Sequence, residues 1–150
     1  MASARNRPLS PHLMDGMRLH WRWGPAMLSS ILHRVTGVGA TVGLAIVLWW
    51  LGALVSGPEA YGKFTTLFWG PASDWSTGAA MLWSLVHLAL KIVVIGCSWS
   101  LIAHALSGIR HFLLDTGAGF ELDTNNFWAS ATTVAGLVLT AIFWSTLLLL

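Results

Sequence analysis

Charged side chains are scarce in this chain of 150 residues: Asp, Glu, Lys and Arg make up 9% of it, whereas a soluble domain carries roughly 25%. So few charges cannot cover a soluble globule with a polar surface. Intrinsic disorder is also excluded, because it requires low hydrophobicity and 55% of this chain is hydrophobic. The single cysteine excludes a disulfide framework, a cysteine zinc site and a covalent c-type haem motif. The class that remains is a small integral membrane protein, which lies in a lipid bilayer and is expected to have no nucleic-acid partner.

Three long runs are nearly free of charge: residues 35–58, residues 75–109 with Lys91 as the only charged side chain, and residues 124–150. A bilayer core about 30 Å thick requires about 20 apolar residues in a helix, so each run is long enough to cross it. We therefore predict an all-α integral membrane protein that forms one anchor domain over residues 1–150. Its predicted parts are an N-terminal segment (1–28) and transmembrane helices at about 29–55, 78–109 and 127–150.

The distribution of basic residues predicts the orientation of these helices. With three spans, the N-terminal segment and the loop after the second span lie on one side of the membrane. That side carries six basic residues, and the loop at 57–76 on the other side carries only Lys63. The six are Arg5, Arg7, Arg18, Arg22, Arg34 and Arg110. We predict a cytoplasmic N-terminus in a bacterial inner membrane, or a matrix N-terminus in the mitochondrial inner membrane if the protein is organellar.

The N-terminal segment has a pattern of its own. Ser10 and Pro11 are a favourable helix start, with a capping hydroxyl and a proline at the first helical position. Leu13, Met17 and Trp21 follow at spacings of four residues. The pattern predicts a short interfacial helix on the inner side, with its apolar face in lipid or on a partner. Ordinary juxtamembrane anchoring is the alternative.

The first predicted span begins with a group of polar side chains. An ionisable residue inside a membrane is costly and therefore suggests a function. Ser30, His33 and Arg34 share one helix face, which Gly37 continues one turn further. Taken singly, Arg34 could be a snorkelling anchor and His33 a hydrogen-bonded packing residue. Together at one membrane edge, the three favour a polar site.

The second predicted span has small residues and one imidazole every fourth position: Gly96, Ser100, His104 and Gly108, with His111 beyond them. Such a ridge is typical of close helix packing, but it would also admit a flat porphyrin, for which imidazole is a common iron ligand. The spacing alone leaves both interpretations open. His104 lies six residues from Arg110, about 9 Å along the helix, so a haem there would lie in the inner half of the bilayer. Its propionates would then reach the level of His33, Arg34 and His111, and carboxylates at a membrane edge need such partners.

Two other ionisable residues lie toward the outer end of the second span. We expect Lys91 to snorkel outward, while the role of His87 stays open. Near the inner end, Asp115 follows Arg110 and His111 closely enough for a local ion pair or hydrogen bond.

Two stretches resemble the signatures of a known family, the cytochrome b subunits of succinate dehydrogenase. S-I-L-H-R-V-T-G at Ser30–Gly37 is similar to the signature S-x-x-H-R-x-[ST]-G. H-A-L-S-G-I-R-H at His104–His111, followed by Asp115, is similar to H-x-x-x-G-[IL]-R-H-x-x-x-D. R-P-L-S-P-H-L at Arg7–Leu13 is similar to the N-terminal lead-in of the family. The resemblance covers the whole chain in order.

The resemblance implies a membrane-anchor subunit of succinate:ubiquinone oxidoreductase, complex II of the tricarboxylic acid cycle and electron transport. The implied partners are a second three-helix anchor subunit, an iron–sulfur subunit and a flavoprotein subunit. FAD and the iron–sulfur clusters would be on those partners, so this chain alone is not expected to oxidise succinate and no catalytic residue is assigned to it. Ubiquinone would receive the electrons near the inner surface.

The resemblance also implies roles for particular residues. His104 matches the axial ligand to the iron of a haem b, whose other ligand would come from the partner anchor. His33, Arg34 and His111 match positions near the haem propionates. Ser30 and Arg34 match the quinone site.

Other functions remain as alternatives. A quinol:fumarate reductase anchor would have similar chemistry at its quinone site, and a haem-free structural anchor would lack the role of His104. A transporter or channel is disfavoured, because there is no inverted repeat and no charged relay through the membrane.

Overall fold

The structure is a computed structural model, which describes residues 14–15, 18–19, 24–71 and 75–149. These residues form two short strands and four helices. The elements are β1 (Met14–Asp15), β2 (Arg18–Leu19), α1 (Pro25–Val55), α2 (Pro58–Trp69), α3 (Gly78–Asp115) and α4 (Leu122–Leu149). Within the described residues, α1, α3 and α4 are long and apolar enough to cross a membrane, with mean hydropathies of 2.1, 2.0 and 1.9 in their most apolar windows. The prediction of an all-α membrane protein with three spans is confirmed.

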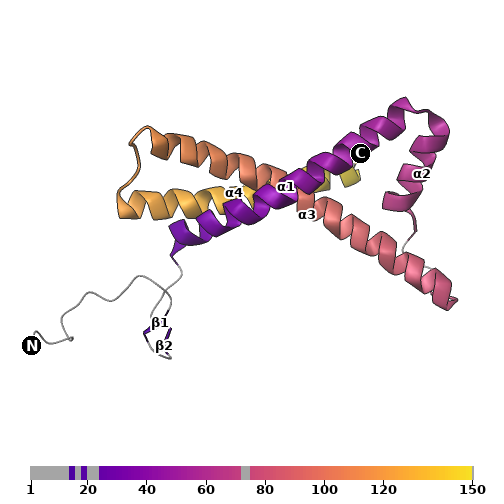
Figure 1. Cartoon of the computed structure of the whole chain (residues 1–150), viewed down its shortest axis with the longest axis horizontal. Coiled ribbons are helices and arrows are strands. Elements are labelled where there is room, and N and C mark those ends of the chain that lie inside the picture. The colour runs from indigo at the N-terminus through magenta and orange to yellow at the C-terminus, as the bar shows by residue number, and fades with distance from the viewer. Residues whose placement is uncertain (1–13, 16–17, 20–23, 72–74, 150) are drawn as a thin grey trace, which may run out of the picture.

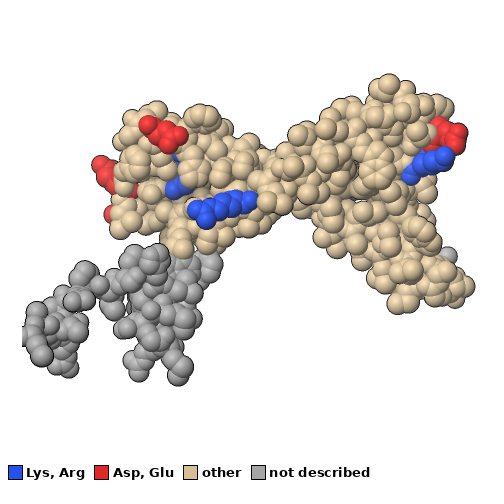
Figure 2. Space-filling model, viewed as in Figure 1, with Lys and Arg blue, Asp and Glu red and all other residues tan. Residues whose placement is uncertain are grey.

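The three long helices contact one another pairwise, and α1 crosses α3 near the middle of the molecule (Figure 1). Where α1 begins, α3 ends and α4 begins, the three helices form one end of the bundle, while α2 returns from α1 toward α3 at the other end (Figure 1). Figure 2 shows charged side chains toward both ends and a broad uncharged region between them. This distribution suits a protein whose middle lies in hydrocarbon.

Each long helix starts or ends beyond the predicted span. α1 begins at Pro25, after Gly24; α3 continues to Asp115; and α4 begins at Leu122. The spans were delimited by runs without charged residues, whereas helical hydrogen bonding continues into the interfacial region. Thus His111 and Asp115, placed at the loop border by the sequence, are helical.

The described part of the N-terminal segment contradicts the predicted interfacial helix. Met14 pairs with Leu19 and Asp15 with Arg18 in an antiparallel ladder, so the helix prediction is wrong at these four positions. The remainder of the predicted helix lies outside the described residues.

α2 occupies part of the segment that was predicted to be a loop. Its first turn contains Pro58 and Glu59, both favourable at a helix N-terminus. Phe64 and Phe68, one turn apart, are buried, and both rings make edge contacts with Trp49 of α1 at centroid distances of 5.5 and 5.7 Å. A helix of 12 residues is too short to span a bilayer, so α2 is a short helix packed on the bundle at the end where α1 ends.

Glycines allow α1 and α3 to approach closely. A Cβ atom on Gly39 would lie 2.8 Å from the Cβ of Ser100, and one on Gly43 would lie 3.0 Å from the Cβ of Cys97. The small-residue ridge of the second span therefore serves helix packing around Ser100. Its ends differ, because a Cβ on Gly96 or Gly108 would meet nothing within 4 Å.

Candidate functional site

Three histidines from α1 and α3 meet at the end of the bundle where α1 begins. The rings of His33 and His104 are stacked, with centroids 4.0 Å apart and planes 8° apart. The ring of His111, two turns beyond His104 on α3, lies 4.8 Å from that of His33 at an angle of 58°. The structure thus brings together the three histidines singled out in the sequence, from two helices.

Hydrogen bonds fix the tautomer of His104. Its Nδ1 lies 3.0 Å from the backbone carbonyl oxygen of His33. Because a carbonyl can only accept, His104 Nδ1 carries the proton and donates, which leaves a lone pair on Nε2 in the neutral ring. A donor bond from the second ring nitrogen to a backbone carbonyl is the usual support of a metal-binding imidazole.

His33 is held by α3 in turn. Its Nδ1 lies 2.7 Å from Ser107 Oγ, while the Ser107 hydroxyl is 2.8 Å from the Ala103 carbonyl oxygen. With the hydroxyl proton donated to that carbonyl, His33 Nδ1–H donates to Ser107 Oγ. Ser107 was not singled out in the sequence, although it lies one turn after His104 on the same face.

The residues present fit a haem on the side of His104. A Cβ on Gly37 would lie 3.1 Å from His104 Cε1, so the imidazole occupies space that any other residue at position 37 would fill. Stacking by His33 covers a face of the ring, whereas the lone pair of Nε2 lies in the ring plane. No cluster of three or more potential metal ligands exists among the described residues.

Ser30 and Arg34 are placed differently from the histidines. Ser30 is half-buried and Arg34 is exposed, and neither makes a side-chain hydrogen bond within the described part of the chain. Both lie within one turn of His33 on α1. They therefore border the histidine cluster and leave their polar groups available to a ligand.

Arg110 joins α3 to α4 by a hydrogen bond, a role that the sequence did not suggest. It is only 6% exposed, and its Nη2 donates to the side-chain oxygen of Asn125 in α4. Asn126 next to it accepts from the backbone N–H of Ala26 at 3.3 Å. Asp115 makes no ion pair or hydrogen bond with Arg110 or His111 in the described part of the chain, so the suggested local pairing is not found. The two consecutive amides at the start of α4 join it to α3 and α1.

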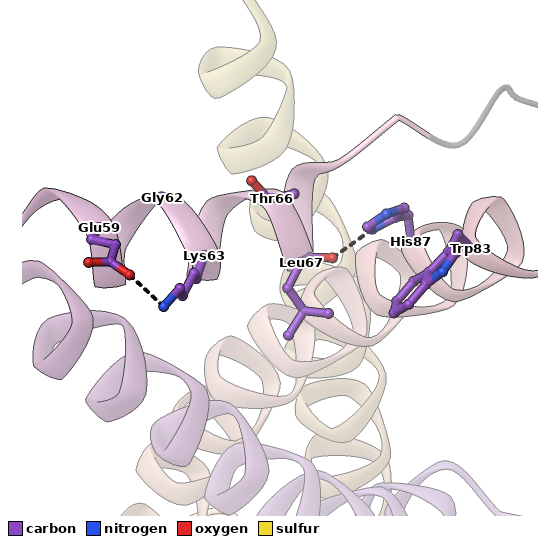
Figure 3. Close-up of a pocket in the computed structure, with 7 residues that line it drawn as sticks. All are labelled: Glu59, Gly62, Lys63, Thr66, Leu67, Trp83 and His87. Carbon is purple, nitrogen blue, oxygen red and sulfur yellow. Dashed lines mark hydrogen bonds and ion pairs between the residues drawn. The ribbon is translucent and has the colours of Figure 1, made fainter. Parts of the chain in front are cut away.

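At the opposite end of the bundle, two residues of α3 bind the C-terminus of α2. His87 Nδ1 donates to the Leu67 carbonyl at 2.7 Å (Figure 3), and Lys91 Nζ donates to the Gly70 carbonyl at 2.9 Å. The last carbonyls of a helix lack partners within it, and cations there are favourable. Lys91 thus binds the backbone directly after α2, and its outward snorkelling stays a prediction. The open hollow beside His87, with a volume of ≈ 580 Å³, contains none of the predicted site residues.

We expect Lys91→Met to loosen α2, because the Gly70 carbonyl would lose a charged donor. A hydrogen bond to a charged group contributes about 1.5–3 kcal/mol, so amide hydrogen exchange in α2 should become roughly tenfold faster or more. Hydrogen exchange by mass spectrometry measures this change. Lys63→Met is the matched control: Lys63 is 76% exposed in an ion pair with Glu59, and such pairs contribute little. Equal effects of the two changes would contradict the capping role.

The sequence model of the family described as "Succinate dehydrogenase/Fumarate reductase transmembrane subunit" matches residues 3–143. This chain belongs to that family. It is accordingly a transmembrane subunit of that class of oxidoreductase complexes, and the family resemblance noted from the two signatures is confirmed.

Relatives from bacteria and a mitochondrion agree with the assignment. The succinate dehydrogenase cytochrome b556 subunit of Paracoccus denitrificans is 32% identical over 138 residues, covering 91% of this chain and 88% of the relative. That of Rickettsia felis (strain ATCC VR-1525 / URRWXCal2) is 28% identical over 138 residues, covering 92% and 90%. The mitochondrial cytochrome b560 subunit of Mus musculus is 30% identical over 135 residues, covering 88% and 65%.

Proposed function

We propose that this chain is the cytochrome b membrane anchor of a succinate dehydrogenase, and that it binds haem b through His104 and forms part of a ubiquinone site. The observation that carries the proposal is the hydrogen bond from His104 Nδ1 to the His33 carbonyl. That bond leaves Nε2 as an unprotonated ligand atom on a ring that is also stacked on His33. The names of the relatives, cytochrome b556 and b560 subunits, support the same cofactor.

The neighbouring side chains would hold the polar edge of the haem. A haem b supplies a one-electron carrier when bound. Its two propionates need cationic or hydrogen-bonding partners at the membrane edge, and His33, His111 and Arg34 lie within one turn of each other or in ring contact. His33 donates from Nδ1 to Ser107, so it would pair with a carboxylate through Nε2 only as an imidazolium that carries a second proton there. The second iron ligand would come from another subunit.

Ser30 and Arg34 would serve the quinone. The hydroxyl of Ser30 can donate to a quinone carbonyl oxygen, and the guanidinium of Arg34 can stabilise negative charge that develops on it during reduction. Neither group is occupied by another side chain of the described residues, so both can turn toward a ligand. The protons that quinone reduction needs would come from water or a partner side chain. Ser30 and Arg34 can donate hydrogen bonds, but neither readily gives up a proton near neutral pH.

The remaining parts of the proposal concern the complex and its membrane. The partners would be a second three-helix anchor, an iron–sulfur subunit and a flavoprotein subunit that carries FAD. The excess of arginine at the histidine end favours an N-terminus in the cytoplasm of a bacterium, with the complex in the inner membrane. A quinol:fumarate reductase anchor is the second candidate, because the family description covers both enzymes; the measured direction of turnover separates them.

We expect Ser30→Ala and Arg34→Ala to reduce succinate–quinone turnover by about tenfold or more, since losing a hydrogen bond to charge that develops in the reaction costs roughly 1.4 kcal/mol or more. Succinate oxidation with a soluble dye acceptor should stay unchanged, because that acceptor does not need the quinone site. Both rates are measured on the purified complex. Ser56→Ala is the matched control: its hydroxyl binds the Gly52 carbonyl at the other end of the same helix. Equal loss in both assays would indicate an assembly defect and contradict the quinone role.

A further inference from the structure

A small polar cavity lies between α1, α3 and α4, next to the histidine cluster. Its volume is ≈ 10 Å³, which is about the least space that one water molecule requires. Seven of the residues that line it carry polar side chains: Ser29, His33, Thr36, Trp99, Ser107, Thr132 and Thr133. Cavities without water are typically lined by apolar groups, so this lining favours an occupied cavity.

Four of the five hydroxyls that line the cavity donate their protons to backbone carbonyls. Thr36 donates to the Leu32 carbonyl at 2.7 Å, Thr132 to that of Trp128 at 2.9 Å, Thr133 to that of Ala129 at 2.9 Å, and Ser107 to that of Ala103 at 2.8 Å. Each of these hydroxyl oxygens keeps a lone pair. The cavity therefore offers more acceptors than donors, with the Ser29 hydroxyl as the fifth lining hydroxyl.

Trp99 carries a hydrogen-bond donor that lacks an acceptor. Its indole Nε1–H is fully buried and has no acceptor among the described residues. A buried donor without a partner costs about 1–3 kcal/mol, and in native proteins such groups are usually satisfied by protein or by ordered water. One molecule that both accepts and donates would satisfy the indole and the hydroxyls together.

We propose that this cavity binds one water molecule, which accepts from Trp99 Nε1–H and donates to hydroxyl oxygens of α1 and α4. Buried waters make about three hydrogen bonds, which this lining can provide. Because His33 and Ser107 line the same cavity, the water would extend their hydrogen bond into α4. The ring that stacks on His104 would then be held by all three spanning helices.

The test is a map of the complete wild-type complex at a resolution that shows ordered water. We expect a peak within hydrogen-bonding distance of Trp99 Nε1 and of at least one threonine hydroxyl. A cavity without a peak, or an indole that donates directly to a protein atom, would overturn the proposal. This measurement needs no variant, so it stays decisive if a variant does not assemble.

Variants then test which group holds the water. Trp99→Phe removes the donor and should weaken the peak strongly, because the remaining lining atoms mainly accept. Thr140→Val is the matched control, since Thr140 is a buried residue of α4 with the same kind of backbone bond, to Gly136, and does not line the cavity. Its peak should equal that of the wild type. Peaks of equal height in the wild type and Trp99→Phe would refute the role of the indole.

Discussion

His104→Ala is expected to abolish the b-type α band in the reduced-minus-oxidised spectrum of the purified complex. The change removes the imidazole of the histidine cluster whose Nδ1 proton is fixed by a backbone carbonyl and whose Nε2 lone pair is therefore available to iron. His33 is not placed to take over, because it holds Ser107 through Nδ1 and presents a ring face, not an edge, to His104. Since the proposal takes a single axial ligand from this chain, we expect loss of essentially all of the band.

Two comparisons separate ligand loss from general damage. His87→Ala removes a buried histidine from the same helix and frees the Leu67 carbonyl, yet it should keep the band, because His87 lies at the opposite end of the bundle. Imidazole added to the His104→Ala complex should restore part of the band by entering the space that the side chain left. An unchanged band in His104→Ala would show that the ligand assignment is wrong.

The sequence was sufficient for the three spans and for the common depth of His33, His104 and His111. Hydrophobic length determines whether a helix can cross a bilayer, and the charges of Arg34 and Arg110 marked one side of the membrane. The ring contacts of the three histidines depend on how α1 packs on α3, which the structure supplies. The sequence left helix packing and haem ligation as alternatives for His104, and the structure makes them compatible: the ring packs on Gly37 while Nε2 stays free.

Contacts between distant residues could not be predicted from the same patterns. The bonds of Arg110 with Asn125 and of Lys91 with Gly70 depend on which helices are neighbours. The sequence of a single span indicates only how deep in the membrane a charged residue lies, and not which residue of another helix it contacts. α2 was missed because its 12 residues are too polar for a span. The spacing of Glu59 and Lys63, and of Phe64 and Phe68, at i and i+4 was the signal that could have revealed it.

Gly39→Ala is expected to destabilise the bundle and to disturb the histidine cluster. In an exposed helix this change should stabilise by about 0.5–1 kcal/mol through helix propensity. Here the added Cβ would lie 2.8 Å from the Cβ of Ser100, and overpacking of this kind costs about 1–3 kcal/mol. Relief requires α1 and α3 to separate, which would lengthen the bond between the His33 carbonyl and His104. We therefore expect a lower midpoint of thermal unfolding and a shifted haem spectrum.

A matched control and a rescue variant distinguish the clash at Ser100 from a general effect of alanine in α1. Gly52 lies on the same helix, and a Cβ there would meet nothing within 4 Å, so Gly52→Ala should leave the midpoint unchanged or raise it. Adding Ser100→Gly to Gly39→Ala removes the atoms that clash and should restore both the midpoint and the spectrum. Because the two substitutions exchange a small side chain across one contact, their effects should be strongly non-additive. Additive effects would mean that the closeness of α1 and α3 at Gly39 does not position His104.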